Sequence, residues 1–121
     1  MRTASDQREE LTLSVGYTGE QAVVCIRGSI DLLTAPELDS ILRAVMARGH
    51  LMVVVDLREL QFMDATGLRV IADASARAVS AGGVLVLESA PPFIQRILAI
   101  TGLDHLIERP APEAAPELQL A

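Results

Sequence analysis

The residues richest in chemistry stand together in the segment D-A-T-G, Asp64 to Gly67. Its carboxylate and hydroxyl, on Asp64 and Thr66, are of the types that serve as an acid and a nucleophile. A hydroxyl normally needs a neighbouring base to become a nucleophile, and the sequence places none within reach of Thr66. We therefore do not expect an enzyme.

The same segment suits both the start of a helix and a contact surface. Asp64 can cap a helix by accepting amide hydrogens from Thr66 or Gly67, and losing such a cap costs about 1 kcal/mol. Gly67 has no side chain, so another backbone or a partner can approach closely. Phe62 and Met63 come just before it, and would add apolar contact area if they are exposed. In the alternative, purely structural interpretation, Asp64 is only a cap, Gly67 relieves crowding and Phe62 packs in the core.

Other reactive side chains lack the companions that their chemistry requires. All ten basic residues are arginines, so a Walker lysine and a Schiff base are excluded. His50 and His105 have no further ligands at metal spacing, and neither a metal nor a cofactor is expected. Cys25 lies in an apolar run and is predicted to be a small core residue. Asp56 ends an apolar strand, like the phosphoacceptor of a receiver domain, but the acidic pair and the lysine of such a site are missing.

Charge and composition narrow the class of protein. The net charge is −6, and an acidic chain with scattered arginines repels phosphate backbones, so nucleic acid is not an expected partner. The polar start lacks the apolar core of a signal peptide, and no apolar run approaches the roughly 20 residues of a spanning helix. A single cysteine is typical of a reducing compartment. These features predict a cytoplasmic protein without direct membrane insertion.

The length of 121 residues fits one domain. We expect a flexible N-terminal segment over residues 1–10 and a folded domain over residues 11–108. Proline, alanine and glutamate dominate residues 109–121, which predicts a disordered acidic tail.

Strands are predicted from alternating or continuous apolar runs. Residues 11–17 alternate as a half-buried strand does, and after a turn at Thr18-Gly19 a more buried strand covers residues 22–26, with Gly28 ending this hairpin. Residues 51–55, closed by Asp56, are expected to form a central strand covered on both faces. Two further strands are predicted, a buried one at residues 84–87 and a short one at residues 106–107.

Three helices are predicted between these strands. The first begins after Thr34, which can cap it, and ends at Gly49, with an apolar face made by Leu38, Ile41, Leu42, Val45 and Met46. The second covers about residues 66–80, with an inner face made by Leu68, Ile71, Ala72, Ser75 and Val79. The third begins at Pro91-Pro92 and ends at Gly102, with an inner face made by Phe93, Ile94, Ile97 and Leu98.

Strands that alternate with helices predict an α/β fold with right-handed crossovers and parallel strand pairs. The N-terminal hairpin is antiparallel and makes the sheet mixed, with the helices packed against it. Asp64 then stands where a loop leaves the carboxyl end of a parallel strand, the usual place of a binding surface in open α/β sheets.

Three segments together carry a resemblance to a known family. They are G-S-I-D-L-L-T-A-P-E-L (28–38), V-V-V-D-L-R-E-L-Q-F-M-D-A-T-G-L (53–68) and I-L-A-I-T-G-L (97–103). In their order and spacing the chain resembles the STAS family, and within it the small bacterial anti-sigma factor antagonists. The resemblance implies a STAS fold and a partner-switching role, in which the unmodified antagonist binds an anti-sigma factor, usually a serine/threonine kinase, and frees a sigma factor.

The resemblance also implies a switch that this sequence changes. In the family the kinase phosphorylates a serine directly after the aspartate that corresponds to Asp64, and the added charge breaks the complex. That position is Ala65 here, so the usual acceptor is missing, and the chain either binds constitutively or is controlled by other means. Thr66 is either a substitute acceptor or a residue with local hydrogen bonds at the helix start.

The expected partner-binding residues follow from the D-A-T-G segment and from the resemblance. Asp31 matches a family position, where it either touches the partner or shapes the turn before Thr34. Arg69 either pairs with an acidic partner or is simply solvated. The predicted contact set is Asp31, Phe62, Met63, Asp64, Ala65, Thr66, Gly67, Leu68 and Arg69. The alternative function, also from the family, is a cytoplasmic STAS subunit that docks on a transporter ATPase or binds a nucleotide or other small ligand.

Overall fold

Strands and helices alternate along the chain in the predicted order. A computed structural model describes residues 10–107; the expected N-terminal segment, except residue 10, and the expected tail lie outside these residues. The strands are β1 (Thr12–Thr18), β2 (Gln21–Ile30), β3 (Met52–Met63) and β4 (Val84–Glu88). The helices are α1 (Ala35–Ala47), α2 (Ala65–Ser80), α3 (Pro92–Thr101) and the 3-10 turn η2 (Asp104–Leu106).

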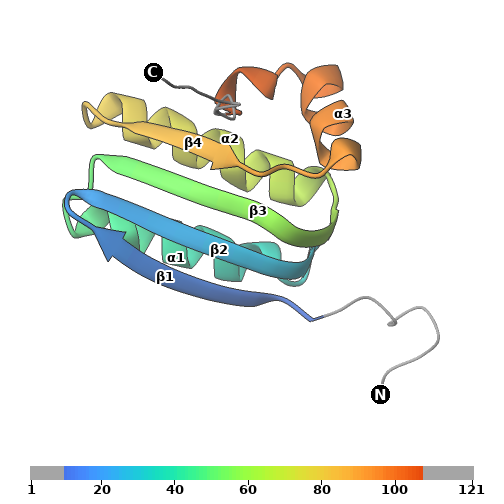
Figure 1. Ribbon diagram of the computed structural model, residues 1–121, viewed down its shortest axis with the longest axis horizontal. Helices are drawn as coiled ribbons and strands as arrows, with labels where there is room; N and C mark the ends of the chain where they lie inside the picture. The colour runs from blue at the N-terminus through green and yellow to red at the C-terminus, as the bar shows by residue number, and fades with distance from the viewer. Residues whose placement is uncertain (1–9, 108–121) are drawn as a thin grey trace, which may run out of the picture.

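The four strands form one sheet in the order β1-β2-β3-β4 (Figure 1). The β1–β2 hairpin is antiparallel, while β2–β3 and β3–β4 are parallel, which confirms the predicted mixed α/β sheet. Thr18 pairs with Gln21, so the hairpin turn consists of Gly19 and Glu20. Gly19 has φ of 61°, a conformation that favours glycine at the first central position of a tight hairpin turn.

Both long helices lie on the same face of the sheet, behind it in Figure 1, and no helix of residues 10–107 covers the opposite face. The central strand is nevertheless buried on both faces, as predicted: Val53, Val54 and Val55 are each at most 1% exposed, although successive side chains of a strand point to opposite faces. The core lies between α1, α2 and the sheet, and β2 contributes Ala22, Val24 and Ile26. Cys25 points to the helix-free face and is exposed, which corrects its prediction as a core residue.

Two strands run further than the sequence pattern indicated. Gly28 does not end β2, which continues to Ile30 after register shifts against β3 on either side of Gly28. Gly28 has φ of 99°, as expected of glycine at a bulge. Likewise β3 continues past Asp56 to Met63, with Leu57, Leu60 and Met63 buried. Because the pairing is irregular here, the buried side chains recur every three residues and not every two. The sequence of this half of the strand therefore lacks the alternation that predicts a strand.

The helix faces are mostly as predicted. Helix α1 buries Leu38, Leu42 and Val45, while Ile41 and Met46 are half-buried. Helix α3 buries Ile94 and Leu98, with Phe93 and Ile97 packed beside them, and ends at Gly102 with φ of 78°. In α2 the buried set is Gly67, Leu68, Ile71, Ala74 and Ala78. Val79 is 63% exposed, so its assignment to the inner face was wrong, because Ala74 and Ala78 let α2 pack closely instead.

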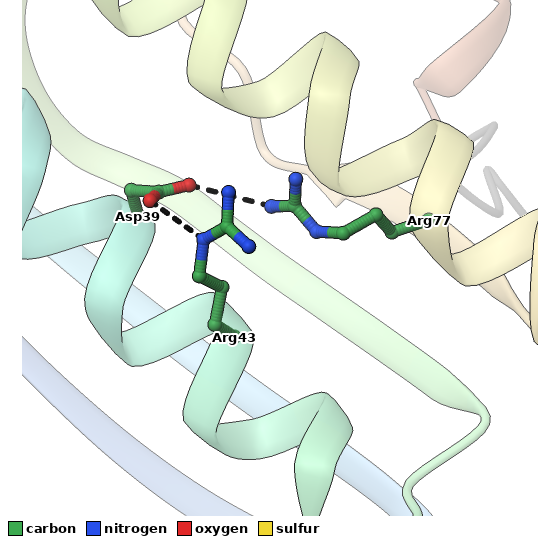
Figure 2. A network of polar contacts seen from close by, with 3 residues as sticks. All are labelled: Asp39, Arg43 and Arg77. Carbon is green, nitrogen blue, oxygen red and sulfur yellow. Dashed lines mark hydrogen bonds and ion pairs between the residues drawn. The ribbon is translucent and has the colours of Figure 1, made fainter.

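An acidic residue joins the two long helices on their outer surface (Figure 2). Asp39 of α1 receives Arg43 Nε at 2.8 Å on one oxygen and Arg77 Nη2 of α2 at 3.3 Å on the other. All three side chains are partly exposed to solvent. The bridge therefore adds modestly to the apolar α1–α2 contact.

The C-terminal part of the fold closes the β4 edge. The predicted strand at residues 106–107 is reduced to one parallel bridge between Ile107 and Leu87, preceded by η2. Leu106, the last residue of this turn, is buried. Among the helices between residues 10 and 107, none combines the length and apolar composition needed to cross a lipid bilayer.

Candidate functional site

Two loops leave the sheet side by side at the carboxyl ends of β2 and β3, on the right in Figure 1. Ile30 pairs with Met63 at the last position of both strands. The amide of Asp64 then donates to the carbonyl of Ile30 at 3.1 Å. This bond holds the β3–α2 junction against the β2–α1 loop, so Asp31 and the D-A-T-G segment belong to one surface.

Asp64 is the N-cap of α2, as predicted. One carboxylate oxygen, Oδ1, accepts the amide hydrogens of Thr66 at 2.9 Å and Gly67 at 3.3 Å. Its carbonyl accepts the amide of Leu68 at 3.2 Å, which continues the helix. The cap fixes the direction of α2 and thereby the position of Ala65, its first residue.

Gly67 is buried against the protein's own core. A Cβ atom at this position would lie 2.7 Å from Met63 Cγ and 2.8 Å from Ile30 Cγ2. The glycine therefore lets α2 approach the ends of β2 and β3 closely, as the structural interpretation proposed. Met63 is only 3% exposed, so it cannot supply exposed apolar area, and that expectation is corrected.

The remaining predicted contact residues differ in exposure. Ala65 and Arg69 are exposed, one turn apart on α2, and Asp64, Thr66 and Phe62 are half-buried. Leu68 is 9% exposed and belongs to the core cluster. A partner docking on the start of α2 would thus meet the methyl of Ala65 and the guanidinium of Arg69 directly.

Asp31 organises the neighbouring loop. Its Oδ1 accepts the amides of Leu33 at 3.0 Å and Thr34 at 3.1 Å, and its own amide donates to Thr34 Oγ1 at 2.9 Å. Thr34 Oγ1 also lies 3.1 Å from the carbonyl oxygen of Ser29, to which it donates. The predicted side-chain cap by Thr34 is therefore wrong. Its hydroxyl bonds the backbone of the preceding loop, at Ser29 and Asp31, and not the free amides of α1.

Sequence reasoning missed two residues of this surface. Leu32 is 71% exposed and Leu33 is 84% exposed, between the Asp31 turn and α1. Two consecutive leucines after a strand were a signal, because a tight Asx turn cannot direct both side chains into one core. They form the most exposed apolar pair beside the D-A-T-G segment.

Chemically, this site offers surfaces rather than reactive groups. It presents two leucines, a methyl group, one guanidinium and the Asp64 carboxylate, one oxygen of which already accepts two amides. Within the described part of the chain, no three histidine, cysteine or acidic side chains cluster in a way that would hold a metal ion. A shallow hollow of about 320 Å³ lies elsewhere, on the helix-free face, and is lined by Thr12, Ser14, Cys25, Ile26, Arg27, Asp56, Arg58 and Glu59.

Comparison with known sequences agrees with this architecture. A family model described as "Mlab, STAS domain" matches residues 13–108. The anti-sigma-B factor antagonist of Listeria monocytogenes is 32% identical over 85 residues, which cover 70% of this chain and 75% of that protein. A putative anti-sigma factor antagonist of Bordetella bronchiseptica, BtrV, is 29% identical over 80 residues, covering 66% of this chain and 69% of its own.

Solved structures show the same fold. An anti-sigma factor antagonist from Mycobacterium paratuberculosis superposes with a TM-score of 0.73 at 28% identity, over 81% of this chain and 83% of that one. The antagonist SpoIIAA in its unphosphorylated form has a TM-score of 0.73 at 16% identity, covering 85% and 88%. A sulfate transporter family protein from Wolinella succinogenes shares the fold, with a TM-score of 0.65 at 17% identity, covering 77% and 75%.

These matches confirm the predicted fold class and the expected regulatory, non-enzymatic role. The matched residues begin in β1 and extend just past η2, so they include every strand and helix of the structure. The chain belongs to the STAS domain family and is an anti-sigma factor antagonist-like member of it.

Proposed function

We propose that this chain binds an anti-sigma factor through the loops at the carboxyl ends of β2 and β3, and thereby frees a sigma factor. The single observation that carries the proposal is the pairing of these loops by the Asp64–Ile30 hydrogen bond on a STAS fold whose relatives are named anti-sigma factor antagonists. The junction surface is the set of accessible residues on the two loops and the first turns of α2: Asp31, Leu32, Leu33, Phe62, Asp64, Ala65, Thr66 and Arg69.

The leucine pair supports binding by a protein. Leu32 and Leu33 leave most of their surface in water, and burial of a leucine side chain contributes about 1.5–3 kcal/mol. A partner that covers both side chains removes their apolar surface from water, which lowers the free energy of the complex. A standard interface buries about 800 Å² on each partner, so we expect the anti-sigma factor to cover both loops and the start of α2.

Ala65 sets the regulation that we propose. The resemblance to the family places the usual phosphoacceptor at this position, where a methyl group cannot carry phosphate. A phosphate here would bring nearly two negative charges beside the Asp64 carboxylate and into the contact. Without that acceptor, the complex with the kinase-type anti-sigma factor lacks its ordinary off-switch and is constitutive or controlled by other means.

Thr66 does not simply replace the missing serine in this proposal. Its side chain is half-buried and its amide is held by Asp64 at 2.9 Å, whereas Ala65 is exposed. A kinase needs the acceptor hydroxyl in line with the transferred phosphoryl group. Thr66 is therefore assigned to the local structure of the helix start.

Binding measurements with purified protein test the docking half of the proposal. The anti-sigma factors of the native cell are titrated against the wild-type chain and against Ala65→Asp and Leu33→Asp, and we expect both changes to weaken binding at least about tenfold, a factor that equals 1.4 kcal/mol. Ile100→Asp is the matched control, because Ile100 is 83% exposed near the C-terminal end of α3, a helix that contributes no residue to the junction surface. Equal affinity of the wild type and both junction variants would contradict the site.

Kinase assays test the regulatory half separately. With ATP and the bound anti-sigma factor, we expect no phosphate on the wild-type chain, and we expect phosphate on the serine introduced by Ala65→Ser. Phosphate mapped to Thr66 in the wild type would refute the proposal that the switch is missing, but it would not contradict the proposed docking surface. Affinity capture that recovers a transporter ATPase instead would favour the alternative function within the same fold.

A further inference from the structure

We propose that β1 pairs with β1 of a second copy of this chain, antiparallel and about a two-fold axis, to give a continuous eight-stranded sheet. The inference does not depend on the partner proposed above. It comes from a difference between the two edges of the sheet and from the sequence of β1.

The two edge strands of the sheet, β1 and β4, differ in what lies on their outer sides. The β4 edge carries the bridge to Ile107 and the adjoining turn η2. At the opposite edge, β1 pairs with β2 on one side only, and no other segment of residues 10–107 pairs with its outer side (Figure 1). The outward amides and carbonyls of β1 are satisfied by water or by another strand.

Strand β1 also lacks the features that usually keep an edge from pairing. Its seven residues, T-L-S-V-G-Y-T, include no charged side chain and no proline. Its pairing with β2 is continuous from Thr12 to Thr18, without a bulge that would twist the edge away. A regular, uncharged edge strand of this kind is a template for a further strand.

The pattern of side chains on β1 is self-complementary, which favours a second copy over an unrelated segment. Leu13 and Val15 face the helix side and pack against the core, and Thr12, Ser14 and Gly16 are exposed on the helix-free side. Antiparallel pairing places like faces together, so the apolar layer of one copy continues into the other.

Charge selects the register of this pairing. With Ser14 of the two copies opposite each other, Leu13 faces Val15, and Leu11 faces Tyr17. With Val15 opposite Val15, Glu10 would face Glu20, and like charges directly opposite are destabilising. A register centred on Leu13 avoids this repulsion too but pairs only residues 12–14 of β1, whereas the register centred on Ser14 pairs residues 12–16, so we assign the two-fold axis to Ser14.

Disulfide trapping tests the register. Ser14 neighbours Cys25 across the hairpin, so Ser14→Cys is made together with Cys25→Ser. Opposite residues in an antiparallel pair have Cα atoms about 4.5–5.5 Å apart, within the range of a disulfide. We expect a covalent dimer after mild oxidation of this variant. Gly16→Cys in the same background is the control, because its two copies would be displaced by four residues and would not link.

Sedimentation velocity over concentrations reaching the millimolar range tests the dimer itself. One pair of edge strands buries less than the standard interface, so we expect reversible growth from the 12.9 kDa monomer towards twice that mass. Ser14→Lys, which opposes two charges at the axis, is expected to weaken the dimer about fivefold, whereas Ser14→Thr retains it. A monomer at every concentration, or equal disulfide yields from the Ser14 and Gly16 variants, overturns the proposal.

Discussion

Gly67→Ala is expected to destabilise the protein although it improves helix propensity. Alanine is favoured over glycine in a helix by at most about 1 kcal/mol. Against this, the new Cβ would lie 2.7 Å from Met63 Cγ and 2.8 Å from Ile30 Cγ2, closer than Cβ atoms pack. Both side chains are buried, at 3% and 0% exposure, so neither moves aside into solvent. Overpacking of this kind costs about 1–3 kcal/mol, which leaves a net loss of about 1 kcal/mol.

Urea denaturation of the wild type and the variant measures this loss, and thermal unfolding should show a midpoint lowered by about 4 °C. Two controls separate the gain in helix propensity from the cost of overpacking. Gly16→Ala adds the same atom where nothing lies within 4 Å, and should be neutral or slightly stabilising. Ala76→Gly, at an exposed position of α2, should lose about 1 kcal/mol through propensity alone. A Gly67→Ala variant as stable as the wild type would refute the close contact between α2 and the strand ends.

Two further predictions concern packing and charge elsewhere in the fold. Gly83→Ala would place its Cβ against the carbonyl oxygen of Leu51, a backbone atom that cannot move aside, and should cost at least about 3 kcal/mol in urea unfolding. Gly82→Ala, with φ of 88° and open space, should cost only about 1 kcal/mol, and equal losses at both glycines would contradict the contact. Asp39→Asn should cost less than about 1 kcal/mol, and a loss that stays unchanged in high salt would contradict an ion pair with Arg77.

Much of the fold could be predicted because local signals and burial agreed. The alternation around Val15, the proline at the start of α1 and the left-handed Gly102 each match an element of the structure. The second half of β3 and the end of β2 could not be predicted, because paired register shifts remove the period of two there. Cys25 was assigned to the core because apolar neighbours indicate burial, but they do not show that its face of the sheet carries no helix from residues 10–107.

The candidate site was predicted in part. Asp64 was identified as the cap because an acidic side chain just before a helix can accept the free amide hydrogens of its first turn, which is a local interaction. The exposure of Leu32 and Leu33, and the burial of Met63, required the structure, since each depends on how two loops from neighbouring strands pack together.

The sequence alone determined the order of elements, the position of the D-A-T-G turn and the absence of a hydroxyl at Ala65, because these depend on residue type and on short-range spacing. Only the tertiary structure decided that β2 and β3 end together, that both long helices cover one face, and that no other strand of residues 10–107 pairs with the outer side of β1. Those features are set by contacts between residues far apart in the chain, and the energy of such contacts cannot be predicted from any single segment.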